Sequence, residues 1–103
     1  MTRISIDELR ADQLRKPVLL LDVRSFESRA RDGWIEGSIH VEDDTKLNAK
    51  SDDEIVVYCD CPNDASAALF SLLLRAAGFA NIRPLSGGIT AWRAWGFRND
   101  ATS

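Results

Sequence analysis

The architecture that we expect follows from residues 54–65, which read Glu54-Ile55-Val56-Val57-Tyr58-Cys59-Asp60-Cys61-Pro62-Asn63-Asp64-Ala65. The first six residues are mostly β-branched or aromatic and give way abruptly to a polar loop, which predicts a strand over 54–59. The helical pattern over 64–77 is apolar nearly all round, so we expect a helix that is buried on most sides. Gly78 is placed to end that helix.

Further apolar runs of strand length alternate with helical patterns along the chain. Strands are predicted at 18–23, 38–41 and 81–85, and helices at 5–16, 25–31 and after residue 88. Strands that alternate with helices form a parallel sheet through right-handed crossovers. We therefore expect an α/β fold of three layers, in which a mostly parallel sheet of four to five short strands has helices on both faces.

The first predicted helix has a clear start and a clear stop. Ser5 and Glu8 have the spacing of a capping box, and Pro17 cannot continue the helix. Ile6, Leu9 and Leu14 are expected to form its apolar face.

Length and charge limit the classes of protein that the chain can represent. It has 103 residues, of which 45% are hydrophobic and 28% charged, as in an ordinary globular domain. We expect one domain over residues 1–103, because this length has no room for two cores. The net charge of −3 argues against nucleic acid or an anionic membrane as the main partner. Neither the length nor the net charge indicates an oligomeric state.

The compartment is inferred from what the sequence lacks. No apolar run approaches the roughly 20 residues of a membrane span, and the N-terminus has no signal-peptide core. Two cysteines without a secretion signal favour a reducing compartment, so we expect a cytoplasmic protein. The cytosolic domain of a membrane-associated protein, cut from a longer chain or bound to a membrane partner, would have the same composition.

Cys59 lies where a parallel sheet binds ligands, at the carboxyl end of the clearest predicted strand. The N-terminus of the next helix favours a negatively charged sulfur, and a curled loop can aim backbone N–H groups at an anion. We expect the Gly87-Gly88 loop to pack closely beside this one. The alternative is that Cys59 is a small buried hydrophobic residue, a common role for free cysteine.

Four motifs follow one another at characteristic spacings: Asp22-Val23-Arg24, then Gly33-Trp34-Ile35-Glu36-Gly37-Ser38-Ile39-His40, then Tyr58-Cys59, then Gly78-Phe79-Ala80-Asn81-Ile82 with Leu85-Ser86-Gly87-Gly88-Ile89-Thr90-Ala91-Trp92. In this order they resemble the rhodanese-like domain over nearly the whole chain. The resemblance implies a sulfurtransferase in which Cys59 takes a sulfane sulfur from a donor and becomes a persulfide.

The same resemblance implies the partners and the binding loop. The donor would be a small anion such as thiosulfate, or a polysulfide, and the acceptor a thiophile such as cyanide or a thiol. The loop from Asp60 to Ala65 would supply the cradle of N–H groups around the sulfur. We expect neither a metal ion nor a cofactor, since zinc bound by Cys59, Cys61 and His40 would lack a fourth ligand.

The loop departs from the family pattern at three positions. Pro62 stands where glycine is usual, Asp64 where arginine is usual, and Ala65 where serine or threonine is usual. Pro62 has no N–H, so the cradle loses a donor. Asp60 and Asp64 are expected to disfavour a thiolate at Cys59 and to repel an anionic donor. The N-terminus of the following helix has the opposite effect, because it favours a thiolate at Cys59.

The other polar residues of the loop leave several roles open. Asp64 or Asn63 is expected to cap the following helix. Cys61 is either a resolving thiol, which would form a strained disulfide with Cys59, or a surface thiol. The Cys-x-Cys-Pro-Asn-Asp loop is similar to those of rhodanese domains appended to bacterial membrane proteins. A non-catalytic or redox-sensing binding module is therefore the alternative function. Phosphatase chemistry is disfavoured because Ala65 stands where its loop needs arginine.

Asp22 and Arg24 follow a strand at the ligand-bearing end of the sheet and are candidate pocket residues. We interpret this pair mainly as structural. His40, the one histidine of the sequence, is also interpreted as a structural polar group and not as a base. Packing in the core and at its rim is the role expected for the three tryptophans, Trp34, Trp92 and Trp95.

Overall fold

A computed structural model describes residues 2–41, 49–60 and 64–100 of the chain, the last four by their backbone alone. The elements in chain order are α1 (Ile6–Arg15), β1 (Leu19–Asp22), α2 (Phe26–Asp32), β2 (Ile39–His40), β3 (Ile55–Tyr58), α3 (Ala65–Ala76), β4 (Ile82–Pro84) and α4 (Gly88–Asp100). Every predicted strand and helix is present, with ends that differ by one or two residues.

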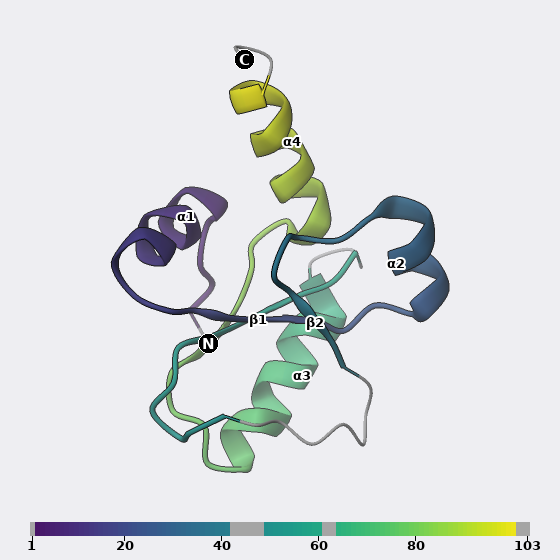
Figure 1. The fold of residues 1–103 in the computed structure, drawn as a ribbon. Helices are drawn as coiled ribbons and strands as arrows, with labels where there is room; N and C mark the ends of the chain where they lie inside the picture. The colour runs from purple at the N-terminus through teal and green to yellow at the C-terminus, as the bar shows by residue number, and fades with distance from the viewer. Residues whose placement is uncertain (1, 42–48, 61–63, 101–103) are drawn as a thin grey trace.

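The four strands form one parallel sheet in the order β2-β1-β3-β4. Helix α3 lies on one side of the sheet, and α1 and α4 lie on the other (Figure 1). At the β4 edge, Ile4 makes an isolated parallel bridge with Leu85, so the N-terminal segment adds a rudimentary fifth position to the sheet. The expectation of a parallel sheet with helices on both faces is confirmed.

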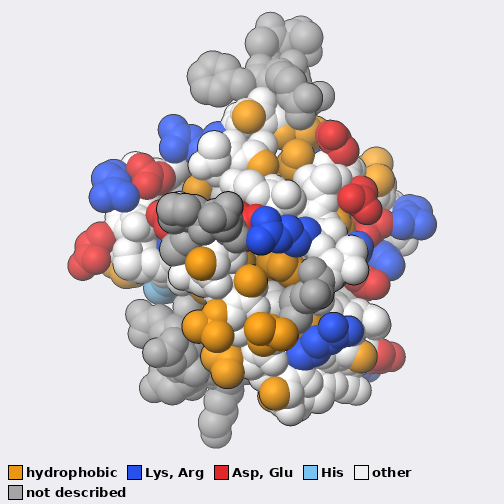
Figure 2. Space-filling view, turned by 180° about the vertical axis from the view of Figure 1, so that it is seen from behind, with side chains coloured by type: hydrophobic (Ala, Val, Ile, Leu, Met, Phe, Trp, Pro, Cys, Tyr) orange, Lys and Arg blue, Asp and Glu red, His pale blue; other side chains and the backbone are white. Residues whose placement is uncertain are grey.

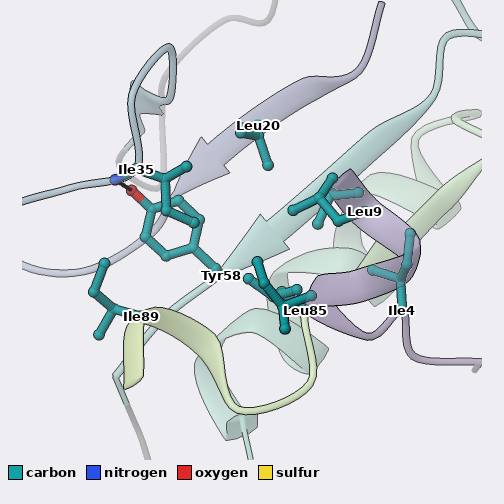
Figure 3. Packing of buried hydrophobic residues seen from close by; sticks show 9 residues of the cluster. Ile4, Leu9, Leu20, Ile35, Tyr58, Leu85 and Ile89 are labelled. Atoms are coloured by element: carbon teal, nitrogen blue, oxygen red, sulfur yellow. Dashed lines mark hydrogen bonds between the residues drawn. The ribbon is translucent and has the colours of Figure 1, made fainter. Parts of the chain in front are cut away.

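Each face of the sheet has its own buried cluster. The cluster on the α1 and α4 side is centred on Tyr58, and the close view in Figure 3 shows residues from both helices and the strands meeting there. Trp92 and Trp95 pack against this cluster. Trp34 is 51% exposed, and the Arg29 guanidinium lies 4.9 Å from the centre of its ring. The tryptophans therefore occupy the core edge and the rim, as expected.

Helix α1 confirms the capping box but corrects one predicted core residue. The Ser5 hydroxyl accepts from the Glu8 amide, and the Glu8 carboxylate accepts from the Ser5 amide. Ile6 and Leu9 are buried, whereas Leu14 is 90% exposed. Five residues of helix rotate a side chain by about 140°, which carries Leu14 away from the face that holds Leu9.

Helix α3 is not buried on most sides, and this prediction was wrong. Among its residues only Ala67 and Ser71 are buried. The side chains on its outer face remain exposed, namely Leu69 at 60%, Leu72 at 55% and Leu73 at 59%. Hydrophobic side chains accordingly gather in the lower half of Figure 2, over the part of the molecule that α3 occupies. The sheet offers α3 one contact face, so an apolar composition all round leaves the opposite face uncovered.

The end of α3 agrees with its sequence signal. Gly78 has a φ of +109°, the amide of Phe79 donates to the Leu74 carbonyl, and the amide of Gly78 donates to the Arg75 carbonyl. This is the glycine-terminated Schellman arrangement, in which a left-handed residue satisfies the last carbonyls of a helix.

The exposed face of α3 predicts that Leu72→Gln changes the free energy of unfolding by less than about 0.5 kcal/mol, as for other surface substitutions. Urea denaturation measures this change. Leu9→Ala is the matched comparison, since Leu9 is fully buried and its truncation is expected to cost about 2–5 kcal/mol. A loss of stability in Leu72→Gln as large as that in Leu9→Ala would contradict the exposed position of Leu72.

Within residues 2–41, 49–60 and 64–100, no helix is both long enough and apolar enough to cross a membrane.

Candidate active site

Cys59 is the residue immediately after β3, at the carboxyl end of an inner strand of the sheet. It is 1% exposed and belongs to the buried cluster on the α3 side of the sheet, together with Ala67 from the first turn of α3. The thiol is therefore placed between the end of a strand and the beginning of a helix. That is the location in which helix N–H groups favour a negatively charged sulfur.

The Gly87-Gly88 segment packs directly on the backbone of Cys59. The Ile89 amide donates to the Cys59 carbonyl at 3.1 Å. A Cβ atom added to Gly88 would lie 2.0 Å from that same carbonyl oxygen, and Gly88 has a φ of +52°. Only glycine fits this position without a shift of the backbone. The predicted packing of the glycine pair beside the Cys59 loop is confirmed.

Gly88→Ala is expected to destabilise the fold by more than about 2 kcal/mol, because the added methyl group meets a backbone atom that cannot rotate away. Gly37→Ala is the control, since Gly37 also has a positive φ but no atom within 4 Å of an added Cβ. Thermal unfolding compares the two variants. Equal losses would show that backbone conformation, and not contact with Cys59, requires glycine at position 88.

Asp64 occupies the N-cap position of α3, but its side chain makes no capping hydrogen bond. Its Oδ2 accepts from Arg3 Nη1 at 2.9 Å and from the Gly87 amide at 3.2 Å. Among the described residues other than glycine, Asp64 alone has a positive φ, of 56°. The left-handed backbone turns the carboxylate away from the helix and toward two distant segments. The prediction that the Asp64 side chain caps α3 was wrong.

Asp60 is exposed beside the same site, and its charge acts on two arginines. Burial alone would lower the pKa of Arg24, but the Asp22 carboxylate and, more weakly, Asp60 raise it above its ordinary value. The pKa of Arg31 is raised mainly by its hydrogen bond with Asp32, with a further contribution from Asp60. Asp60 therefore lies close enough to Arg24 and Arg31 for its charge to act on both of them.

Asp22 and Arg24 form a buried ion pair with Tyr58. Asp22 Oδ1 accepts from the amide and from Nε of Arg24, each at 3.0 Å, while Oδ2 accepts from Arg24 Nη2 at 2.7 Å. The Tyr58 hydroxyl also donates to Oδ2, at 2.9 Å. Neither charged side chain has any exposed surface. This placement supports the structural interpretation of the pair over the pocket one.

Two pKa values within this network are shifted. Burial alone would raise the pKa of Asp22, but hydrogen bonds from Arg24 and Tyr58 outweigh it and lower that pKa below its ordinary value. Burial, together with the neighbouring Asp22 charge, raises the pKa of Tyr58. Asp22 is therefore ionised and Tyr58 is protonated at neutral pH.

The network extends to the segment between α2 and β2. Tyr58 accepts from the Ile35 amide, as Figure 3 shows, and lies 2.7 Å from the Ser38 hydroxyl. His40 Nε2 lies 2.8 Å from the Arg24 carbonyl oxygen, so the ring donates there and has the structural role expected of it. Tyr58 was not among the residues that the sequence predicts to contact the ion pair. The sequence feature that could have identified it is the polar hydroxyl of Tyr58 in an otherwise apolar strand, because a buried hydroxyl must find a hydrogen-bond partner.

The structure thus brings Cys59, Asp64 and the glycine pair together, with Asp60 at the exposed side and the Asp22 pair in the interior. The predicted loop residues Cys61, Pro62 and Asn63 lie outside the described residues, and Ala65 begins α3. In the described part of the chain, no three side chains of His, Cys, Asp or Glu gather closely enough to hold a metal ion.

Residues 5–94 match the family model of the rhodanese-like domain. A rhodanese-like domain protein from Staphylococcus aureus is 30% identical, with a TM-score of 0.76 over 89% of this chain and 91% of that one. A rhodanese-related protein from Thermoplasma volcanium is 25% identical, with a TM-score of 0.73 over 93% and 94% of the two chains.

A human single-domain sulfurtransferase shares the fold at 22% identity, with a TM-score of 0.76 over 91% of this chain and 96% of that one. No curated protein sequence matches the chain.

Proposed function

Because the chain belongs to the rhodanese-like domain family, we propose that it is a sulfurtransferase that carries sulfur as a persulfide on Cys59. The observation that carries this proposal is the position of Cys59, which ends an inner strand and packs with the first turn of α3. A thiolate is the nucleophile required to attack a sulfur atom, and a helix N-terminus favours the thiolate.

The first half-reaction transfers a sulfur atom to the enzyme. The Cys59 thiolate attacks the outer sulfur of thiosulfate, and a new S–S bond forms. The bond between that sulfur and the sulfonate group breaks, and sulfite leaves with its electron pair. The product is a Cys59 persulfide anion, which backbone N–H groups at the loop and helix N-terminus would stabilise.

The second half-reaction returns the enzyme to its starting state. A thiophile such as cyanide attacks the outer sulfur of the persulfide and leaves as thiocyanate, and Cys59 recovers its thiolate. A thiol acceptor would leave as a persulfide in the same way. Sulfur is transferred without an added oxidant or reductant, so the cycle needs no cofactor. It does need a reduced Cys59, which is why we propose a cytoplasmic location.

Burial of the thiol favours a second candidate function. Cys59 is 1% exposed, so a small donor reaches the thiol only after the groups that cover it move apart. A rhodanese-like module that only binds a partner or senses redox state would not need that access. A membrane protein, fused or bound, is one partner that we propose for such a module.

Intact mass after incubation with thiosulfate separates the two functions. A sulfurtransferase gains one sulfur atom in the wild type and in Cys61→Ser, but not in Cys59→Ser, and then loses it on addition of cyanide. Polysulfide is tested in parallel, because it does not depend on the same anion recognition. If the folded protein gains sulfur from neither donor, the binding module is the better account. A gain that disappears in Cys61→Ser alone would assign the carrier role to the other cysteine.

A further inference from the structure

The charged pair Arg3–Asp64 lies beside the Cys59 site and joins three segments of the chain. We propose that this pair holds Cys59 in place relative to the start of α3 and that Arg3 makes the site prefer anionic sulfur donors, an inference that rests on the function proposed above. The loop sequence by itself predicts only the repulsion of an anionic donor by Asp64, because Arg3 lies 61 residues away in the chain.

Asp64 connects the end of the Cys59 loop to the glycine pair. Its Oδ2 accepts from the Gly87 amide, while the next two residues, Gly88 and Ile89, contact the Cys59 carbonyl. A single carboxylate oxygen therefore links the start of α3 to the segment that holds the backbone of Cys59. Such a link restricts where the thiol can lie relative to the helix N-terminus.

Arg3 is itself held in place by the edge of the sheet. The neighbouring Ile4 amide donates to the Pro84 carbonyl at 3.0 Å, and the Ser86 amide donates to the Ile4 carbonyl at 2.9 Å. These two bonds fix the backbone next to Arg3 alongside the segment that leads to Gly87. The 2.9 Å contact between Arg3 and Asp64 is therefore made between two anchored segments.

The two charges of the pair differ in exposure. The Asp64 side chain is 6% exposed, whereas the Arg3 side chain is 44% exposed. An anion that approaches from solvent therefore meets the guanidinium, while the carboxylate is screened by its partners. The solvent-exposed member of the pair is therefore the positively charged Arg3, although the loop residue Asp64 is negatively charged.

The same contacts bring Arg3 close to Cys59. Asp64 contacts Gly87, Cys59 contacts Gly88, and consecutive Cα atoms are about 3.8 Å apart. Adding these contacts and one Cα–Cα step places the Arg3 guanidinium within about 15 Å of the Cys59 carbonyl oxygen, well inside the Debye length of about 30 Å at 0.01 M salt. At that distance its charge still acts on an incoming anion.

The test compares a negatively charged and a neutral reagent of similar size at the same thiol. Iodoacetate and iodoacetamide are used on the full chain in a Cys61→Ser background, and the mass gain gives the two rates of Cys59 alkylation. The ratio of the rates isolates the charge that the reagent meets. The variants are Arg3→Gln, Arg3→Lys and Asp64→Asn.

Arg3→Gln is expected to lower the iodoacetate to iodoacetamide ratio by about threefold at low salt, and Asp64→Asn is expected to raise it by a similar factor. Arg3→Lys keeps the charge and is expected to keep the ratio. The differences should vanish in 1 M salt, where the screening length is about 3 Å. Arg75→Gln removes an equal charge from the last turn of α3, about 15 Å along the helix from its N-terminus, and should change the ratio much less than Arg3→Gln does.

Three results would overturn the proposal. Equal shifts in Arg3→Gln and Arg75→Gln would show that Arg3 has no special position at Cys59. Parallel losses of both rates in Arg3→Gln and Asp64→Asn would make the pair a structural brace without a role in specificity. Absence of alkylation by either reagent in the folded protein would show a site closed to small molecules, which cannot have a donor preference.

The outcome is separable from that of the proposed function. If Cys59 gains sulfur from thiosulfate but the alkylation ratio does not respond to Arg3, the function stands and this inference fails. If the ratio responds as expected but no sulfur is gained, the charged pair acts at Cys59 in a protein that is not a sulfurtransferase.

Discussion

Cys59→Ser is expected to lower thiocyanate formation from thiosulfate and cyanide by at least about a thousandfold, to the rate without enzyme. The serine hydroxyl is a weak nucleophile at neutral pH and there is no histidine among the described residues around Cys59 to activate it, since His40 is bonded to the Arg24 carbonyl. A hydroxyl also cannot store sulfur in an exchangeable S–S bond. Steady-state thiocyanate production measures the loss.

Two controls make this result specific to the thiol. Cys61→Ser is expected to retain most of the activity if Cys59 is the sulfur carrier. Circular dichroism and thermal unfolding of Cys59→Ser should show an intact fold, because serine is nearly the same size and Cys59 contributes to the core mainly as a small side chain. Full activity in Cys59→Ser would remove the basis of the proposed function.

Asp22→Asn is expected to destabilise the fold by about 3–5 kcal/mol, because it leaves the fully buried Arg24 guanidinium without its counter-charge. A domain of this size has a total stability of about 5–15 kcal/mol, so the variant is expected to be partly unfolded at ambient temperature. Urea denaturation with detection of tryptophan fluorescence measures the change.

Tyr58→Phe keeps the measurement interpretable if Asp22→Asn fails to fold. It removes the hydroxyl that donates to Asp22 and accepts from Ile35, but it retains the ion pair. The expected loss is about 1–3 kcal/mol, the cost of leaving a buried polar group unsatisfied. A loss in Tyr58→Phe that exceeds the loss in Asp22→Asn would show that the ion pair is not the main stabilising element.

The lowered pKa of Asp22 also sets the direction of the pH dependence. Its contribution to stability is fully present above the ordinary carboxyl pKa of 3.8 and is lost as the pH falls from there toward the lower pKa of the folded state. The wild type should therefore lose stability more steeply than Asp22→Asn below about pH 4. Equal slopes for the two proteins would contradict a lowered pKa at Asp22.

Much of the fold follows from local sequence patterns. The capping box at Ser5 and Glu8, the Schellman end at Gly78 and the apolar run of β3 each depend on residues that are close together in the chain. Their physics is local, since a helix end is capped by its neighbours and a buried strand must be apolar on both faces. The alternation of these elements then predicts the parallel sheet and the position of Cys59 at its carboxyl edge.

The burial of side chains and the charges around Cys59 depend on contacts between segments that are far apart in the chain. The apolar pattern of α3 could not show that its outer leucines have no partner, because burial is a property of the neighbours and not of the helix. Asp64 was expected to cap α3 and to repel anions, yet it bonds Arg3, which is 61 residues earlier in the chain. The motif of Asp22 and Arg24 was interpreted as a mainly structural pair at the carboxyl end of the sheet. That Tyr58 completes the pair was decided by the register of β1 beside β3, which places Asp22 opposite Tyr58. Electrostatic energies depend on distance and burial in space, and only the folded chain determines both.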